Sequence, residues 1–248
     1  MARKVLIAGE SWTSFTTHVK GVDTFNTSVY EEGVAWLREA VEKAGFDVVY
    51  MPNHHAQDNL PFTAEEYGEY AAMILSDIGS NTLLLPGVTF SKSLRRPNRC
   101  MAIRDYVRKG DALVMIGGYM SFSGIDGKAR YGATAVADVL PVSCLSVDDR
   151  REHHEGISPK VIKVHPLVEG IDGEWPCCLL GYNKTEAKPE WDVVVEIDGD
   201  PLISAGDFGQ GRSAVVTSDC SPHWAPPEFV NWKHYNTLWK NMLNYVVR

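Results

Sequence analysis

The chain has 248 residues, 44% of them hydrophobic, and a formal net charge of −8 at pH 7. This length allows one large domain with a substantial core. The acidic balance argues against a nucleic-acid-binding protein, and the longest apolar runs are strand-length, too short to cross a membrane. The apolar run near the start is also too short for a secretory signal. We therefore expect a soluble, cytoplasmic protein.

The five cysteines show neither the spacing of a disulfide framework nor that of a metal site, so buried thiols are expected. They are Cys100, Cys144, Cys177, Cys178 and Cys220.

The first half of the chain alternates between strand and helix patterns. Buried strands are predicted over 4–9, 46–52, 81–87 and 112–118. Amphipathic helices are predicted over 31–45, 64–77 and 99–110. Capping-box spacing supports the first two helix starts, with Ser28 and Glu31 at the first and Thr63 and Glu66 at the second. This alternation favours a parallel sheet with helices on both faces.

The second half reads as short strands separated by turn residues, closed by a helix over 231–247. The strand segments are 138–147, 160–167, 176–182 and 191–219. Within the last, "DGDP" (198–201) and "GQGR" (209–212) are hairpin-turn signals. No linker or repeat interrupts the sequence, so we predict a single domain over 1–248 with a β-rich elaboration at about 138–210.

Ligands of open parallel sheets bind beyond the carboxyl ends of the strands. Polar residues follow each predicted strand: Glu10, Ser11 and Trp12; Asn53, His54 and His55; Thr89, Ser91 and Lys92; Tyr119, Ser121 and Ser123; and Asp219, Cys220, Ser221, His223 and Trp224. We expect ligand-binding residues among Glu10, Ser11, Trp12, His54, Gly117, Gly118, Arg130 and Trp224. Arg130 and the basic run 92–99 are candidates to hold an anionic group.

Several motifs resemble those of a bacterial family of cytoplasmic class I glutamine amidotransferase-like proteins. They are "GESW", "HVKGVD", "GGYMSFSGIDGKARYGAT", "VLPV" and "SDCSPHW", and the resemblance covers nearly the whole chain. The family is similar in build to trehalose-utilisation-type proteins and to the trimerisation domain of some β-galactosidases. The resemblance implies an α/β fold, a flavodoxin-like three-layer α/β/α sandwich of the class I glutamine amidotransferase-like type, with additional β-strands in the second half.

The active relatives use a G-x-C-x-G nucleophile elbow and, after a late strand, a histidine followed two residues on by a glutamate. In this chain Tyr119 stands at the cysteine position and Ser121 at the last glycine. His223 matches the base, but Ala225 replaces the glutamate. A tyrosine, with a pKa of about 10, is a poor substitute for a thiolate. The resemblance therefore implies a family member that lacks the elbow cysteine and does not hydrolyse glutamine.

Three roles remain open. The first is a binding or assembly role, in which the protein binds a small, carbohydrate-related molecule or takes part in an assembly. The second is a hydrolase in which Ser121 or Ser123 is the nucleophile, or His223 activates a water, with Asp219 or Glu10 orienting the imidazole. The third is a structural homo-oligomer, with a trimer suggested by the β-galactosidase resemblance.

Two pairs of adjacent histidines, His54–His55 and His153–His154, lack the converging spacing of a metal site. His54, His55, Asp219 and His223 are the best donors that the sequence offers. We predict no metal and no cofactor, and neither a nucleic-acid nor a membrane partner.

Overall fold

The computed structural model describes residues 3–171, 175 and 179–248. Its centre is one sheet of eight strands, in the order β4-β1-β5-β6-β14-β13-β12-β9. The strands are β1 (Lys4–Gly9), β4 (Asp47–Met51), β5 (Ala72–Ser76), β6 (Ala112–Ile116), β9 (Lys160–Val161), β12 (Asp192–Ile197), β13 (Asp200–Phe208) and β14 (Gly211–Val216). The first five in spatial order run parallel, and β13, β12 and β9 extend the sheet antiparallel. The predicted α/β class is confirmed.

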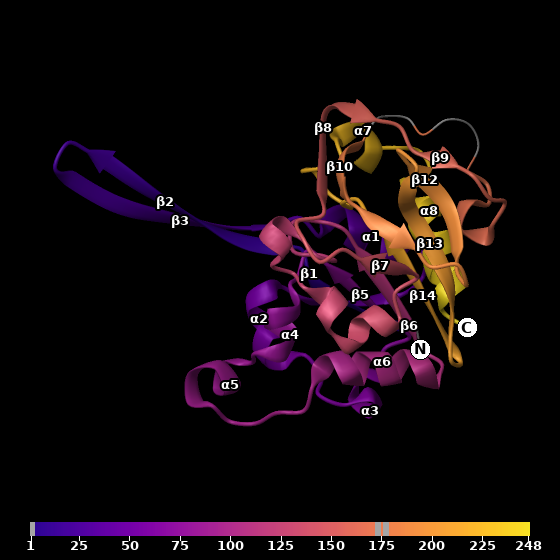
Figure 1. The fold of residues 1–248 in the computed structure, drawn as a ribbon, viewed down its shortest axis with the longest axis horizontal. Helices are drawn as coiled ribbons and strands as arrows, with labels where there is room; N and C mark the ends of the chain where they lie inside the picture. Colours follow the sequence, from indigo (N-terminus) through magenta and orange to yellow (C-terminus); the bar gives the residue numbers. More distant parts are fainter. Residues whose placement is uncertain (1–2, 172–174, 176–178) are drawn as a thin grey trace.

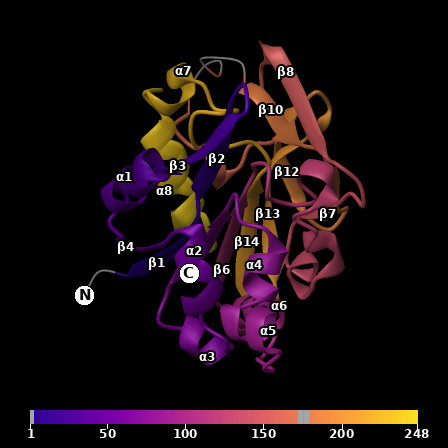
Figure 2. The ribbon, with the colours of Figure 1, turned by 90° about the vertical axis from the view of Figure 1, so that its left-hand side faces the viewer.

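Helices cover both faces of this sheet because its central strands are apolar on both sides. Val5 and Ile7 of β1 face a core that includes α1 (Ala35–Lys43) and α8 (Tyr235–Val246). Leu6 and Ala8 face the opposite core, which includes α6 (Arg99–Lys109). Figure 2 shows α1 and α8 on one side of the sheet and α4 (Ser80–Leu84) and α6 on the other. The result is a three-layer α/β/α sandwich.

Short elements complete the body. The helices are α2 (Asn53–Asn59), α3 (Ala64–Tyr67), α5 (Gly87–Lys92) and α7 (Pro227–Val230), with 3-10 turns at Ile125–Gly127, Tyr131–Ala133, Ala135–Asp138 and Pro166–Val168. Two small antiparallel sheets pair β7 (Val142–Cys144) with β11 (Thr185–Ala187), and β8 (Arg150–Ile157) with β10 (Leu179–Asn183). None of the described helices is both long and apolar enough to cross a bilayer.

A long hairpin leaves the body between β1 and α1. Its strands, β2 (Ser11–Lys20) and β3 (Asp23–Glu32), pair only with each other among the described residues. Figure 1 shows this hairpin projecting far from the rest of the molecule. The predicted helix start at Ser28 and Glu31 is therefore wrong: both residues belong to β3, and α1 begins after Val34 without a side-chain cap.

The third sheet strand is also placed differently from the prediction. Thr63 and Glu66 do form a capping box, but α3 ends after four residues, at Gly68. The rest of the predicted helix 64–77 contains β5, whose five buried residues pair with β1 and β6. The apolar run 81–87, predicted as the third strand, is largely α4 instead. Because β5 pairs with both β1 and β6, neither of these strands has a free edge there with which the segment 81–87 could pair.

Two predicted strands are much shorter than expected: 160–167 contains only β9 and ends in a 3-10 turn, and 138–147 contains only β7. The other predicted elements agree better. The hairpin turns at 198–201 and 209–212 connect β12, β13 and β14, and Asp198, Gly199 and Gly209 have the positive φ angles that such turns favour. Residues 176–178 of the predicted strand 176–182, which include Cys177 and Cys178, lie outside the described residues. Cys100 and Cys220 are buried free thiols, and Cys144 is a partly buried one.

Candidate functional site

The carboxyl ends of four neighbouring strands meet at one edge of the sheet. Glu10 follows β1, Asp77 follows β5, Gly117 follows β6, and Thr217 begins the segment after β14 that carries Asp219 to Trp224. Parallel strands end at the same edge, so these segments converge. We call the group Asp77, Tyr119, Glu152, Asp219 and His223 the rim.

The glycine-rich turn after β6 uses its own N–H groups to hold its shape. Gly118 N donates to Asn183 Oδ1 at 3.0 Å, and Met120 N donates to Asp77 Oδ1 at 2.6 Å. The N–H groups of Ser123 and Gly124 both donate to the buried carboxylate of Asp149. Asp149 also accepts from Asn183, so one buried network fixes the whole turn.

Gly118 is required for the close approach of Asp77. Its φ of +141° is rare for other residues, and a Cβ built there would lie 2.7 Å from Asp77 Oδ1. Asp77 itself has a φ of 45°. Both residues thus have backbone conformations that hold the carboxylate against the turn.

The two serines of the turn make local hydrogen bonds. Ser121 Oγ donates to the carbonyl of Ile116 at 2.5 Å and accepts from Asp77 N at 3.2 Å. Ser123 Oγ donates to the carbonyl of Leu145. Both side chains are buried, and neither hydroxyl has His223 among its described hydrogen-bond partners. This geometry gives the hydrolase hypothesis no nucleophile–base pair.

Tyr119, at the elbow position, packs against His223. Their ring centroids are 4.4 Å apart and perpendicular, and the Arg150 guanidinium lies 5.0 Å from the tyrosine ring centroid. Glu152 accepts hydrogen bonds from Tyr119 Oη at 3.2 Å and from Trp224 Nε1 at 2.9 Å. Partial burial, together with Glu152, raises the pKa of Tyr119, so its phenol stays protonated at neutral pH.

His223 is held by an acidic partner on its own segment. Its Nδ1 lies 3.6 Å from Asp219 Oδ2, and its side chain is 41% exposed whereas that of Asp219 is 6% exposed. The nearby Asp219 carboxylate raises the pKa of His223 above its usual value, against the opposing effect of burial. The imidazole is therefore more readily protonated than a free histidine, and it faces solvent.

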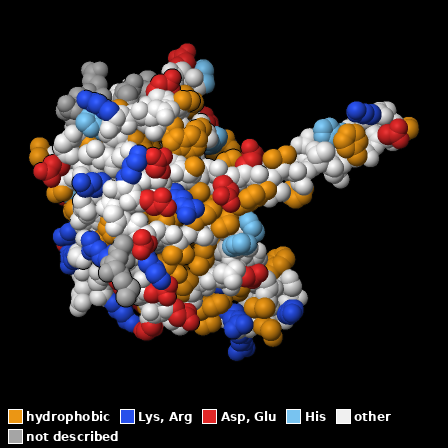
Figure 3. All heavy atoms as spheres, turned by 180° about the vertical axis from the view of Figure 1, so that it is seen from behind, with side chains coloured by type: hydrophobic (Ala, Val, Ile, Leu, Met, Phe, Trp, Pro, Cys, Tyr) orange, Lys and Arg blue, Asp and Glu red, His pale blue; other side chains and the backbone are white. Residues whose placement is uncertain are grey.

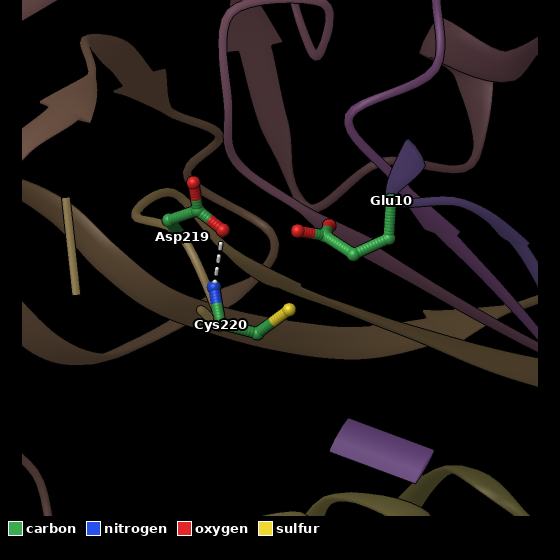
Figure 4. A group of neighbouring side chains, drawn as sticks. All are labelled: Glu10, Asp219 and Cys220. Carbon is green, nitrogen blue, oxygen red and sulfur yellow. Dashed lines mark hydrogen bonds between the residues drawn. The ribbon is translucent and has the colours of Figure 1, made fainter. Parts of the chain in front are cut away.

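Behind the rim lies a buried polar cluster, shown in part in Figure 4. Glu10 accepts hydrogen bonds from Ser76 Oγ at 2.5 Å and from Ser221 Oγ at 2.8 Å. Burial raises the pKa of Glu10 to about 8, and the nearby carboxylates of Asp219 and Asp77 add to the effect. The carboxyl group is therefore mostly protonated at neutral pH.

Cys220 belongs to this buried cluster. Its Sγ lies 3.7 Å from Ser76 Oγ, and its backbone N–H donates to Asp219 Oδ1 at 2.7 Å (Figure 4). Burial raises the pKa of the thiol well above its usual value, which leaves it protonated and unreactive. Glu10, Asp219 and Cys220 do place ligand-type atoms within 4.8 Å of one another. Binding of a cation there would require the Glu10 carboxyl group and the Cys220 thiol to lose their protons.

The remaining predicted residues are spread over several places. Ser11 accepts a hydrogen bond from Asn53 N, and Trp12 donates to Glu31 on the hairpin. His54 is exposed on α2, with its ring against Tyr30. Arg130 is exposed and lines a separate cavity of about 290 Å³ with Ser123, Cys144 and others. Thr89, Ser91 and Lys92 lie in or beside α5, so their placement after a strand is wrong.

Sequence reasoning missed Asp77 and Glu152. Asp77 directly follows the apolar run "MIL" and Ser76, which was a usable strand signal, but that segment was assigned to a helix. Glu152 comes from β8, and no sequence pattern indicates that β8 lies near the strand ends of the main sheet. Only the folded chain brings it against Tyr119 and Trp224.

The model of one protein family, described as putative glutamine amidotransferase and of the class I amidotransferase-like type, matches residues 4–248. The chain belongs to this class I glutamine amidotransferase-like family. Two solved structures of cytoplasmic proteins from Salmonella typhimurium resemble it throughout. One is 44% identical with a TM-score of 0.94, covering 98% of this chain and 99% of its own. The other is 45% identical with a TM-score of 0.95, covering 99% and 100%.

More distant members of the fold are also similar. A ThuA-like protein from Parabacteroides merdae has a TM-score of 0.57 at 10% identity, covering 100% of this chain and 90% of its own. This likeness concerns the fold alone. No curated protein matches the chain.

Proposed function

We propose that this amidotransferase-like protein does not hydrolyse glutamine and instead binds a small, carbohydrate-related molecule at the rim. One observation carries the proposal: the carboxylate of Asp77 accepts the N–H of Met120 at 2.6 Å. In an amidotransferase elbow, the N–H that follows the nucleophile stabilises the oxyanion of the acyl intermediate. Here that donor is already bound to a negative group.

The electrostatics of the turn also oppose acyl transfer. Burial raises the pKa of Asp77 to about 6, which still leaves the group mostly ionised at neutral pH. A developing oxyanion beside it would be repelled, since two like charges in a poorly hydrated site are costly. Tyr119 supplies no thiolate, and Cys220 is a buried, protonated thiol. The machinery for attacking an amide is therefore incomplete at two points.

The same groups suit a neutral, hydroxyl-rich ligand. The carboxylates of Asp77 and Glu152 can accept hydrogen bonds from hydroxyl groups, and the imidazole of His223 can donate one. Tyr119 and His223 offer adjacent ring surfaces for the apolar face of a sugar ring. The abundance of carboxyl groups at this edge disfavours an anionic ligand. A cytoplasmic location is part of this proposal, supported by the two relatives that are described as cytoplasmic proteins.

The absence of glutaminase activity is tested by restoring the missing thiol. Tyr119→Cys is expected to release no glutamate from glutamine, because Asp77 still occupies the oxyanion donor. Reaction of the introduced thiol with iodoacetamide, followed by intact mass, is the control that it is accessible. The proposal would be overturned if the parent protein released glutamate from glutamine and the Cys220→Ala variant did not.

Binding is tested with a panel of monosaccharides, disaccharides and polyols by saturation-transfer NMR and calorimetry. For any ligand found, Tyr119→Ala and His223→Gln are expected to weaken binding by about tenfold or more, which corresponds to about 1.4 kcal/mol. His154→Gln, on the exposed part of β8, is the matched control and should leave binding unchanged. An equal loss of affinity in His223→Gln and His154→Gln would contradict a binding site at the rim. Conversion of the ligand to a product would instead support the hydrolase in which His223 activates a water.

A further inference from the structure

The hairpin of β2 and β3, residues 11–32, is an arm with almost no packing on the body. Every residue from Trp12 to Glu32 is exposed except His18, which is partly buried. Figure 1 shows the arm extending away from the sheet, and Figure 3 shows hydrophobic side chains along its length. The large exposed apolar side chains of the arm are Trp12, Phe15, Val19, Val22, Phe25, Val29 and Tyr30.

Such an arm is poorly stabilised by itself. A lone two-stranded hairpin is marginally stable in water and needs a further strand or a covering layer. Within the arm, the side chains of His18 and Phe25 stack and those of Thr17 and Asn26 form a hydrogen bond, but Phe15 remains 80% exposed and Val22 98% exposed. Burying side chains of this size contributes about 1.5–3 kcal/mol each. The arm therefore has a strong physical reason to be covered.

The root of the arm lies against the buried cluster behind the rim. Gly33 N donates to the carbonyl of Glu10 and closes the base of the hairpin. A Cβ at Gly33 would lie 2.7 Å from both Glu10 Oε1 and Ser221 Oγ, so the root packs on the cluster behind the rim. A partner that packs along the arm therefore meets the edge of the sheet where His223 is 41% exposed.

The charge of the arm suits a second copy of the same acidic chain. Between Thr13 and Tyr30 the only charged residues are Lys20 and Asp23, which are opposite in sign and directly paired in the hairpin. The whole chain, by contrast, has a net charge of −8. Two copies that met through other acidic surfaces would repel each other, whereas this nearly uncharged surface avoids that cost. A nucleic acid or an anionic lipid surface would find no basic patch here.

We propose that two copies of the chain exchange arms about a two-fold axis, so that each arm packs on its partner and covers the partner's rim. Strands of ten residues extend for about 33 Å, and a two-stranded ribbon is roughly 10 Å wide. Each arm face therefore covers about 330 Å², and its contact buries a similar area on the partner. The two symmetric contacts together bury on the order of 1,300 Å², within the range of stable interfaces. The inference does not depend on which ligand the rim binds, because its test measures association alone.

The oligomeric state of the full chain tests the first half of this inference. Analytical ultracentrifugation is expected to show a dimer for the parent protein at micromolar concentration. Phe15→Asp combined with Val19→Asp, which places charge on one face of the arm, is expected to raise the dimer dissociation constant at least a hundredfold. Phe90→Asp, at a similarly exposed phenylalanine on α5, is the matched control and should leave the dimer intact. A monomeric parent protein, or equal dissociation of both variants, would overturn the proposal.

Photo-crosslinking tests the second half. With p-benzoylphenylalanine in place of Phe15, ultraviolet light is expected to join two chains, with crosslinked peptides from residues 77–79, 119–121 and 219–224 of the other copy. The same group in place of Phe90 should not crosslink these peptides. Crosslinks between chains that map only to other surfaces would overturn the covering of the rim. If ligand binding fails but these crosslinks form, only the proposed function is wrong.

Discussion

Glu10 joins three parts of the molecule through one side chain. It directly follows β1, its carbonyl closes the base of the arm, and its buried carboxyl group binds Ser76 and Ser221. Its φ of 50° is unusual for a residue other than glycine. The surrounding contacts hold this conformation and keep the carboxyl group away from water.

Burial of Glu10 makes the stability of the protein depend on pH. Its pKa is about 8 in the folded chain and 4.5 when free, so the folded state retains a proton that the unfolded state loses. The stabilising contribution is complete below about pH 4.5 and is lost as pH rises toward 8, at up to about 1.4 kcal/mol per pH unit. We expect the free energy of unfolding from urea titrations to fall by a few kcal/mol over this range.

Glu10→Gln removes this titration and should flatten the dependence. The amide keeps an oxygen acceptor and adds N–H donors, so the contacts with the two serines can persist. Glu228→Gln, at an exposed position in α7, is the control and should retain the slope of the parent protein. Parallel curves for the parent protein and Glu10→Gln between pH 5 and 8 would show that Glu10 is not the responsible group.

At the scale of single residues, the sequence predicted the position of Tyr119 but not that of Asp77. Tyr119 could be placed after a sheet strand because two glycines follow a short apolar run, which is a strong local pattern. Asp77 could not be placed, because its strand was read as the end of a helix. Its contact with Met120 N depends on β5 lying beside β6. That adjacency is long-range, and local pattern does not encode it.

Among the elements, the arm stands apart in its energetics. Its strands pair residue for residue from Ser11 with Glu32 to Lys20 with Asp23. It contacts the body only near its root among the described residues, for example where the Tyr30 ring lies against His54, and the rest of both faces is exposed. Sequence analysis missed it because its Thr-rich strands mix apolar and polar residues on both faces. A pattern of one buried face, which usually reveals a strand, is absent when no face is buried.

Removing the arm should leave the folding of the body nearly unchanged. Trp12 and Glu31 are directly paired, so replacing residues 13–30 by Asn-Gly gives a two-residue hairpin turn between them. We expect the thermal midpoint of this variant to differ by only a few degrees from that of the parent protein at dilutions where the parent is monomeric.

A change at the root should behave in the opposite way. Gly33→Ala places a Cβ 2.7 Å from two buried oxygens, and we expect it to lower the thermal midpoint more than loss of the whole arm. A large loss of stability on arm deletion would show that the arm contributes to the folding of a single chain.

At the scale of the whole molecule, one sheet separates two cores. The parallel and antiparallel parts are continuous through the pairing of β6, β14 and β13. Leu113 of β6 lies in the core beside α6, and Leu202 of β13 lies in the opposite core beside α8. A shared sheet couples the two cores mechanically, so they should unfold together.

Two core variants test this coupling. Leu113→Ala and Leu202→Ala are each expected to destabilise the protein by about 2–5 kcal/mol, because both side chains are fully buried. Each variant should shift one calorimetric transition of the whole chain, with coincident changes in tryptophan fluorescence and far-UV circular dichroism. Separate transitions, of which each variant shifts only one, would contradict the predicted single domain.

The sequence by itself determined the α/β class, most of the sheet strands and the position of Tyr119 in the glycine-rich turn. These features follow from short-range patterns: apolar runs of strand length, helical periodicity and turn residues. The tertiary structure alone decided that β5 fills the centre of the sheet, that Asp77 occupies the turn's N–H donor, and that Glu10 and Cys220 are buried and neutral. It also decided that the arm projects. Each of these depends on which distant segments become neighbours, and burial and pKa are properties of those neighbours.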